Sequence, residues 1–286
     1  MKSLQQTKTL IDISHKVGKK ISYIQGGGGN TSVKINKSLM VIKASGTNLK
    51  DMRIDKGQAL VDFKKINKFL EGPEISEEDF STKINSISRN KSQRPSIETG
   101  FHSLLGKFVI HTHSVYVNVL LCSEEGKKII KELFPESLWV DYFSPGKNLT
   151  LAVKEKLKKT KKNRNEEKIV FLQNHGLIVS SETGLRSLEI HEQVNKKVKD
   201  HLKLTGFKVK SSFEINERKV LFPDQIVYLD GEAKTRSSAA KETLSAYSYI
   251  KQEIKNLNLS PKYLSEKDVL KIKNMDSEKY RKSLVN

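Results

Sequence analysis

Residues 107–113, Lys-Phe-Val-Ile-His-Thr-His, constrain the fold of this chain more than any other stretch of the sequence. The β-branched and aromatic side chains at 107–110 predict a buried β-strand. Successive side chains of a strand point to opposite faces, so His111 and His113 share one face and can bind one metal ion. A single histidine in an apolar strand is usually a hydrogen-bonded core residue. Two histidines at this spacing make a metal site a serious alternative.

A second apolar stretch, Lys-Ile-Val-Phe-Leu at 168–172, predicts another strand that ends shortly before Asn-His-Gly at 174–176. This strand would deliver His175 just before a glycine turn. Three imidazoles without a thiolate suit Zn²⁺ and leave coordination positions open for a substrate. The sequence therefore favours a metal site formed by His111, His113 and His175, with a catalytic rather than a structural role.

The other four histidines give weaker signals. His15, His191 and His201 fall in amphipathic helical patterns, and we expect them to be exposed to solvent. His102 follows Glu98 by four residues, so the two side chains share one face if the segment is helical. His102 is therefore a candidate partner of the metal site.

Length and composition limit the class of protein. A chain of 286 residues fits one large domain, or one domain with an appendage. No stretch approaches the ~18 consecutive apolar residues of a membrane span. The N-terminal residues Met-Lys-Ser-Leu-Gln-Gln lack the apolar segment of a signal peptide. A single cysteine, Cys122, excludes an intramolecular disulfide and cysteine-based zinc binding. Together these features predict a cytoplasmic protein without membrane contact.

The net charge of +19 raises the possibility of nucleic-acid binding. Only 8 of the 52 basic residues are arginines, although bidentate recognition of bases and phosphates favours arginine. The densest basic run, residues 154–164, ends a predicted helix and contains no stacking aromatic residue. We therefore predict no nucleic-acid partner, although a cationic surface can attract a phosphorylated substrate.

Predicted helices and strands alternate along the chain, which indicates an α/β fold. We expect a main domain over residues 1–231 and a polar, helical extension over residues 232–286 that has no core of its own. The segment 73–94 is polar and is expected to form a loop or short helix. The expected strands are Val33–Ile35, Leu39–Ala44, 58–63, 107–110, 168–172 and a late strand, Val227–Leu229. The expected helices are 3–20, 95–105, 115–121, 149–160, 182–204, Tyr247–Leu257, Glu266–Lys273 and Ser277–Leu284.

Two glycine-containing turns are candidates for binding phosphate. Gly26–Ser32 contains four glycines, among them Gly29, that allow a ligand to approach the backbone, and Asn30 adds a side-chain donor. Ser45-Gly46-Thr47 follows a predicted strand and offers further amides and hydroxyls. Such loops are often only tight turns. Neither is a P-loop or a dinucleotide-binding motif, because a strand rather than a helix follows the glycines.

The motifs in this order resemble the class II aldolase/adducin family, which includes fuculose- and rhamnulose-phosphate aldolases and ribulose-phosphate epimerases. The resemblance covers about residues 5–230. Residues 260–282 also resemble the tail of longer relatives in which an aldolase-like domain is joined to a short-chain dehydrogenase, and this sequence has no such dehydrogenase. The motifs are Gly-Asn-Thr-Ser (29–32), Ala-Ser-Gly-Thr (44–47), Pro-Ser-Ile-Glu (95–98), Phe101-His102, His-Thr-His (111–113), Tyr-Phe-Ser-Pro-Gly (142–146) and Asn-His-Gly (174–176).

The resemblance implies a three-layer α/β/α sandwich with a C-terminal helical extension, and tetramers with sites at subunit interfaces. It implies that His111, His113 and His175 bind one Zn²⁺ or another divalent ion and that Glu98 is the catalytic carboxylate. The implied substrate and phosphate contacts are Gly29, Asn30, Ser45, Gly46 and Ser96. Ile97 departs from the family, in which a second serine is common at this position, and this departure weakens the case for a phosphate.

The implied function is that of a zinc-dependent aldolase-type lyase. It would cleave or form a C–C bond in a sugar or sugar phosphate through a metal-stabilised enediolate, with Glu98 carrying a proton. Tyr116 and Tyr142 are equally good candidates for a second acid. One alternative is an epimerase, dehydratase or decarboxylase that uses the same metal site. Another is a non-catalytic binding domain like that of adducin, although such a domain has no need of Glu98 and three histidines.

Overall fold

A computed structural model describes residues 2–73, 76–89, 93–160, 167–210, 219–229, 237–276 and 279–280 of the chain. Seven strands in these residues form one mixed sheet with the order β3-β2-β1-β4-β7-β6-β5. Only β5 and β6 pair in parallel, and all other neighbours are antiparallel. The strands are β1 (Asn30–Lys34), β2 (Leu39–Lys43), β3 (Gln58–Asp62), β4 (Phe108–Thr112), β5 (Leu138–Val140), β6 (Lys168–Leu172) and β7 (Gly176–Ser181).

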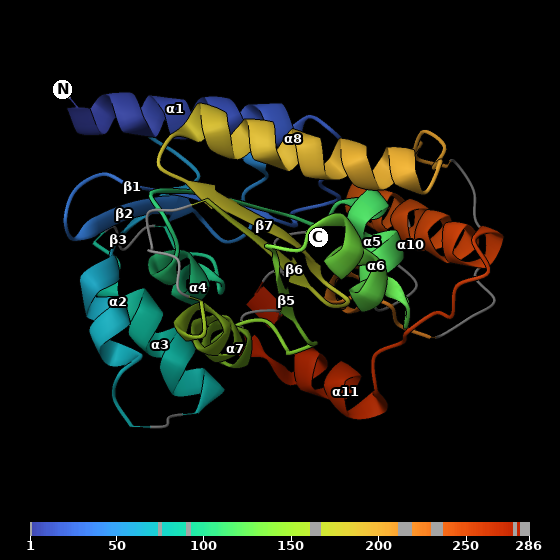
Figure 1. The fold of residues 1–286 in the computed structure, drawn as a ribbon. Helices are drawn as coiled ribbons and strands as arrows, with labels where there is room; N and C mark the ends of the chain where they lie inside the picture. The colour runs from blue at the N-terminus through green and yellow to red at the C-terminus, as the bar shows by residue number, and fades with distance from the viewer. Residues whose placement is uncertain are drawn as a thin grey trace.

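Helices cover both faces of this sheet (Figure 1). One layer contains α1 (Lys2–Gly18) and α8 (Gly184–His201), with α5 (Val115–Leu121), α6 (Gly126–Leu133) and α10 (Ser238–Asn256) towards one end. The opposite layer contains α2 (Phe63–Phe69), α3 (Glu77–Ile87), α4 (Thr99–Leu104) and α7 (Lys147–Lys158). The remaining described elements are a 3-10 turn (Leu49–Asp51), α9 (Pro223–Tyr228) and α11 (Glu266–Asn274). The predicted three-layer α/β/α fold with C-terminal helices is confirmed.

Alternation along β4 explains how the two layers are held. Phe108 and Ile110 pack in the core cluster shared with α1, α5 and α10, whereas Val109 packs in the cluster shared with α4 and α7. All five residues of β4 are buried, as expected for the central strand of a covered sheet. The same alternation carries His111 to the side of α4 and α7, and Thr112 to the side of α8.

Several secondary-structure predictions need correction. Val227–Leu229 is not a strand: its first two residues end α9, which begins with Pro223 at the first helical position. Proline favours that position because its fixed φ suits a helix and the missing N–H has no partner there. Residues 73–94 contain the full helix α3, capped by Ser76, whose hydroxyl accepts a hydrogen bond from Asp79 N at 3.0 Å. The strands β5 and β7 and the helices α2 and α6 were not predicted.

The C-terminal helices pack on the main core. Ala246, Ile250 and Ile254 of α10 belong to the same buried cluster as residues of α1, β4 and α5. The predicted boundary at 231/232 lies outside the described residues, as does most of the predicted helix Ser277–Leu284 and the end of the basic run 154–164. The division into a main domain and an extension therefore stays a prediction.

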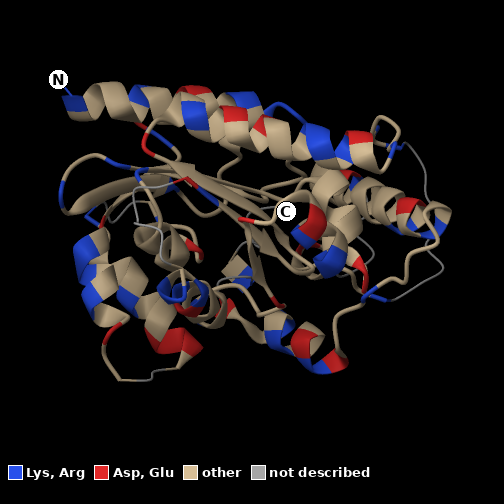
Figure 2. Cartoon of the chain, viewed as in Figure 1, with Lys and Arg blue, Asp and Glu red and all other residues tan. Residues whose placement is uncertain are grey.

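Basic and acidic residues are interspersed along the outer helices (Figure 2). Lys20 and Glu192 pair at 2.7 Å between α1's end and α8, and Arg186 pairs with Glu167 at 2.5 Å. Exposed pairs of this kind contribute little to stability, because solvent screens their attraction. No described helix has the length and apolar character needed to cross a membrane.

Candidate metal centre and active site

Three buried histidines meet where β4 and the β6–β7 turn end. His111 is paired with Ile178 of β7, His113 lies just beyond β4, and His175 lies in the turn before Gly176. The three ring centroids are 4.9, 5.0 and 4.9 Å apart, and one ligand nitrogen from each ring lies within 4.8 Å of the others. The structure thus brings together the three histidines that the sequence indicated as metal ligands.

The turn that carries His175 depends on its neighbours. Asn174 has a φ of 53°, a left-handed conformation that asparagine tolerates better than most residues. A side chain at Gly176 would place its Cβ 2.2 Å from Thr112 O and 3.1 Å from His111. Only glycine allows the β6–β7 turn to pack this closely against the end of β4.

Hydrogen bonds orient two of the imidazoles. Nδ1 of His111 lies 3.0 Å from Leu177 O, and Nδ1 of His113 lies 2.6 Å from Oδ2 of Asp224. Both partners only accept hydrogen bonds, so both Nδ1 atoms carry the proton in neutral rings. The two Nε2 atoms then face each other with lone pairs, 3.1 Å apart. Tetrahedral Zn²⁺ with bonds of about 2.0–2.1 Å places its ligand nitrogens about 3.3 Å apart.

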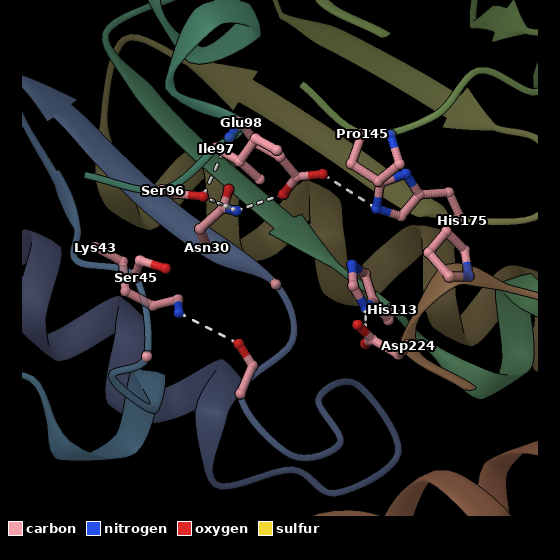
Figure 3. A pocket seen from close by; sticks show the side chains of 14 residues that line it. Asn30, Lys43, Ser45, Ser96, Ile97, Glu98, His113, Pro145, His175 and Asp224 are labelled. Atoms are coloured by element: carbon pink, nitrogen blue, oxygen red, sulfur yellow. Dashed lines mark hydrogen bonds and ion pairs between the residues drawn. The ribbon is translucent and has the colours of Figure 1, made fainter. Parts of the chain in front are cut away.

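Glu98 closes the fourth side of this cluster. The residue directly precedes α4, and its Oε1 lies 3.1 Å from His175 Nε2 (Figure 3). Its Oε2 lies 3.4 Å from His111 Nε2. Burial would raise the pKa of Glu98, but the imidazoles of His111 and His175 outweigh that effect and hold the pKa well below its usual range. Ionised Glu98 and the two lone pairs are all acceptors, and a cation between them offsets their repulsion.

The donor set therefore fits a divalent metal. Burial outweighs the attraction of Glu98 and lowers the pKa of His111 well below its usual value, which favours the neutral ring that a metal ligand requires. Three imidazole nitrogens and one carboxylate oxygen are typical ligands of Zn²⁺ and similar ions. The chemistry of these four side chains supports a single metal site.

A row of buried polar side chains supports Glu98 from behind. Asn30 Nδ2 donates to Glu98 Oε2 at 2.5 Å and to Ser96 Oγ at 3.1 Å, and Asn30 Oδ1 bonds to His102 Nε2. Ser32 Oγ completes the row at 2.7 Å from His102 Nδ1. Burial lowers the pKa of His102 to about 3, so the ring is neutral and donates from Nε2. His102 is thus linked to Glu98 and the three histidines through Asn30 and is not one of the candidate metal ligands.

A pocket opens beside this cluster (Figure 3). The turn at residues 44–47 lies against residues 94–96, because Ser45 N donates to Arg94 O at 2.8 Å and Ala44 pairs with Pro95. All nine predicted site residues except His111 line the pocket. Its lining residues are Gly27, Gly29, Asn30, Lys43, Ser45, Gly46, Ser96, Ile97, Glu98, His113, Pro145, His175, Pro223 and Asp224.

Two charged residues of the pocket were missed by the sequence reasoning. Lys43 is only 3% exposed, and its ammonium donates to Thr47 O at 2.7 Å and Gly27 O at 3.3 Å, between the two glycine turns. Asp224 comes from α9. Lys43 was not predicted because a lysine at the end of a strand is usually exposed to solvent. Its place three residues before Gly46 was nevertheless a usable signal. Ile97 and Pro145 give the pocket an apolar side.

Neither tyrosine suggested as a second acid is among the pocket-lining residues. Tyr116 belongs to the core cluster with α10, and its hydroxyl accepts from Phe207 N at 3.3 Å. Burial and the charge of Asp268 on α11 raise the pKa of Tyr142. Tyr228 is nearer to the site, since its hydroxyl accepts from Gly27 N at 3.0 Å.

The predicted exposure of three histidines is only partly correct. His201 is exposed, and His15 is half-buried with Nε2 2.8 Å from Met52 O. The prediction for His191 is wrong: this residue of α8 is fully buried, with its ring 2.7 Å from Thr112 Oγ1 and close to Asn195. Ser187 and Asn195, one turn to either side on the same face of α8, are also buried.

The sequence of this chain matches the family Class II Aldolase and Adducin N-terminal domain over residues 8–199. This match covers well over half of the chain, and the chain belongs to that family. The uncharacterized oxidoreductase YuxG of Bacillus subtilis strain 168 is 29% identical over 187 residues, which are 61% of this chain and 26% of YuxG. The chain therefore spans about a quarter of the length of this curated relative.

Two solved structures share the fold. The N-terminal class II aldolase domain of a Thermoplasma acidophilum protein superposes with a TM-score of 0.59 at 24% identity, over 68% of this chain and 92% of that one. YgbL of Klebsiella pneumoniae superposes with a TM-score of 0.51 at 17% identity, over 74% of this chain and 96% of that one. At these identities the similarity establishes the fold, and the chemistry has to be argued from the site itself.

Proposed function

We propose that this protein is a metal-dependent lyase of the aldolase type that cleaves or forms a C–C bond in a sugar or sugar phosphate. The observation that carries the proposal is the convergence of acceptor atoms: the Nε2 atoms of His111 and His113 face each other beside His175 and ionised Glu98. The pocket lies next to this cluster. A divalent ion bound there supplies Lewis-acid stabilisation of negative charge on substrate oxygens.

Glu98 is the proposed acid–base group. Its carboxylate is ionised, lines the pocket and is held by the amide of Asn30, so its oxygens are directed at the cluster. A carboxylate fixed in this way can accept a proton from a substrate hydroxyl or return one to a carbon centre, a contribution of roughly 10²- to 10⁴-fold in rate. Burial of Glu98 excludes bulk water from the proton transfer.

Lys43 and the two glycine turns are the proposed binding site for an anionic group of the substrate. Lys43 brings a positive charge into the pocket between Gly27 and Thr47, and Ser45, Gly46 and Ser96 line the same wall. Charge-assisted hydrogen bonds from an ammonium and backbone amides suit a phosphate. Ile97 lines the pocket and has no hydroxyl to donate to an anion. The positive charge of Lys43, on the same pocket, would supply affinity for the anion instead.

The same side chains would also serve an epimerase, a dehydratase or a decarboxylase, because each of these needs charge stabilisation next to a carbonyl. The zinc identity, a homotetramer and a cytoplasmic location remain parts of this proposal. A non-catalytic, adducin-like binding domain is disfavoured by Glu98, whose buried charge would cost stability in a scaffold without a cation.

The test is a screen of zinc-loaded protein against ketose phosphates, unphosphorylated ketoses and their acid derivatives. Release of dihydroxyacetone phosphate or lactaldehyde is expected, and the release should be absent in Glu98→Gln. Change of configuration without cleavage, or release of CO₂ or water, would replace the lyase by one of the related reactions. A metal-loaded protein that turns over none of these substrates would contradict the proposal of an enzyme acting on sugars.

A further inference from the structure

A second region of the chain reaches the metal cluster from outside the matched family segment. Asp224, on α9, is 25 residues beyond the end of that segment at residue 199. Its side chain is 3% exposed, lines the pocket and lies 2.6 Å from His113 Nδ1 (Figure 3). Burying an aspartate lowers the stability of the fold unless its carboxylate is paired or hydrogen-bonded. The contact with His113 provides such a partner.

Contacts around α9 hold Asp224 in this position. Oε1 of Gln225 accepts hydrogen bonds from Leu221 N at 2.7 Å and from Phe222 N at 3.2 Å, which fixes the start of the helix. Asn174 Nδ2 donates to Leu221 O at 2.8 Å. Because Asn174 adjoins His175 in the chain, the β6–β7 turn that presents one metal ligand also anchors the helix that orients another.

The first glycine turn lies over the pair of Asp224 and His113. A Cβ added to Gly28 would come within 2.7 Å of Asp224 Oδ2 and 2.8 Å of His113 Nδ1. The turn is tied to the C-terminal helices on both sides: Gly27 N donates to the hydroxyl of Tyr228, and Gly26 N donates to Glu242 Oε2 of α10 at 2.6 Å. A side chain at residue 28 would therefore collide with the His113–Asp224 pair.

We propose that Asp224 is a positioning residue for His113 and that α9 thereby completes the metal site. The carboxylate holds the proton of His113 on Nδ1, keeps Nε2 directed at the cluster, and increases the electron density that Nε2 donates. Removing such a partner of a metal-bound histidine commonly weakens metal affinity by about 10- to 100-fold. The inference rests on the metal site proposed above, and it assigns part of that site to a segment outside residues 8–199.

Zinc affinity of the full chain, measured by competition with a chromophoric chelator, tests this role. We expect Asp224→Asn to bind Zn²⁺ about tenfold more weakly, because the amide can still accept the bond but has lost the charge. In Asp224→Ala the zinc affinity should be weakened by nearer to 100-fold. Asp62→Asn is the matched control, because Asp62 is also a buried aspartate but caps α2, far along the sheet. The zinc affinity of this variant should equal that of wild type. The visible spectrum of the Co²⁺-substituted protein should change in Asp224→Ala and not in Asp62→Asn.

The outcomes separate this inference from the proposed function. Wild-type protein that binds no zinc would overturn the metal site itself. Wild-type affinity in Asp224→Asn and Asp224→Ala, with folding verified by circular dichroism, would overturn only the role of Asp224, and so would an equal loss in Asp62→Asn. If Asp224→Ala does not fold, Gly28→Ala provides the second variant, because its Cβ displaces the pair without removing a charge. Gly28→Ala should also weaken zinc binding, and unchanged binding in it would contradict the inference.

Discussion

β4 presents two kinds of buried histidine environment, one on each face. On the side of α4 and α7, His111 lies with His113 and His175, and their ring centroids are about equally spaced. On the side of α8, the neighbouring residue Thr112 bonds to His191. Both His111 and His191 are fully buried. Burial lowers the pKa of His111 well below its usual value and lowers the pKa of His191 to about 4. Burial and pKa therefore do not distinguish a ligand from a structural histidine.

The two environments differ in what the ring nitrogens face. Nε2 of His191 is matched by the hydroxyl of Thr112, and the ring packs edge-on against Tyr23. Nε2 of His111 faces Nε2 of His113 and the carboxylate of Glu98. The proton of the His111 ring is on Nδ1, which donates to Leu177 O. In the described part of the chain, the only close group of three metal-capable side chains is His111, His113 and His175. Convergence of unsatisfied acceptors, rather than burial, marks the site.

The largest expected effect is loss of metal when a histidine of the candidate metal site is replaced, and no loss of metal when His191 is replaced. His113→Ala removes one of three imidazole ligands, so elemental analysis of the purified protein should show metal content falling from about one ion per chain to nearly none. His191→Ala should keep the metal and lose stability, by roughly 1–3 kcal/mol for an unsatisfied buried partner at Thr112. Equal metal content in wild type and His113→Ala would show that His113 is not a metal ligand.

The next effect is on turnover. Glu98→Gln preserves the shape of the side chain and should lower kcat by roughly 10²-fold or more, as loss of a general acid–base does. Metal content should fall much less than in His113→Ala. Asn30→Ala should lower kcat as well, because the amide of Asn30 holds Glu98. Kinetics on the substrate identified by the screen are the measurement, and kcat within twofold of wild type in both variants would remove Glu98 from the chemistry.

A smaller effect is expected at the opposite wall of the pocket. Lys43→Met removes a buried positive charge and should raise KM for an anionic substrate by about tenfold with less change in kcat, and it should weaken competition by inorganic phosphate. Ser45→Ala is the milder comparison, since it removes a hydroxyl only. If a sugar and its phosphate ester bind wild type equally well and phosphate does not compete, the two glycine turns serve only the fold.

The smallest effect concerns stability and pH on the side of α8. The pKa of His191 is about 4 in the folded protein and near 6.5 when unfolded, so the unfolded chain binds more protons between these values. The free energy of unfolding should therefore fall as pH falls from about 6.5 to 4, by up to about 3 kcal/mol from this residue. His191→Gln should show a shallower pH dependence in urea unfolding. The same slope in the variant and in wild type would show that His191 is not buried as a neutral ring.

The sequence predicted those parts of the site that depend on local spacing. The i and i+2 positions of His111 and His113 on an apolar strand are enough to place both on one face. The segment 168–172 became β6 with the predicted bounds, and the glycine after His175 indicated its turn. His191 could have been predicted as buried, because Ser187, Val194 and Asn195 complete a buried face of α8.

Asp224 and Lys43 could not be placed from spacing, because each reaches the site through the tertiary fold. Asp224 and His113 are 111 residues apart, and α9 is only one and a half turns long. The apolar triplet at 227–229 is too short to separate a strand from a helix by periodicity. Lys43 follows the strand pattern of β2, and only the turn at 44–47 brings its ammonium back over Gly27. Site residues of this kind depend on contacts between segments rather than on any local pattern.

The most direct test of the central claim is a crystal structure of the protein purified without chelators, with anomalous data collected on both sides of the zinc absorption edge. The account predicts one anomalous peak per chain, about 2.0–2.1 Å from the Nε2 atoms of His111, His113 and His175, with Glu98 or a substrate oxygen as a further ligand. A structure with no peak there after incubation with Zn²⁺, and with the Nε2 atoms of His111 and His113 joined by a hydrogen bond instead, would contradict it.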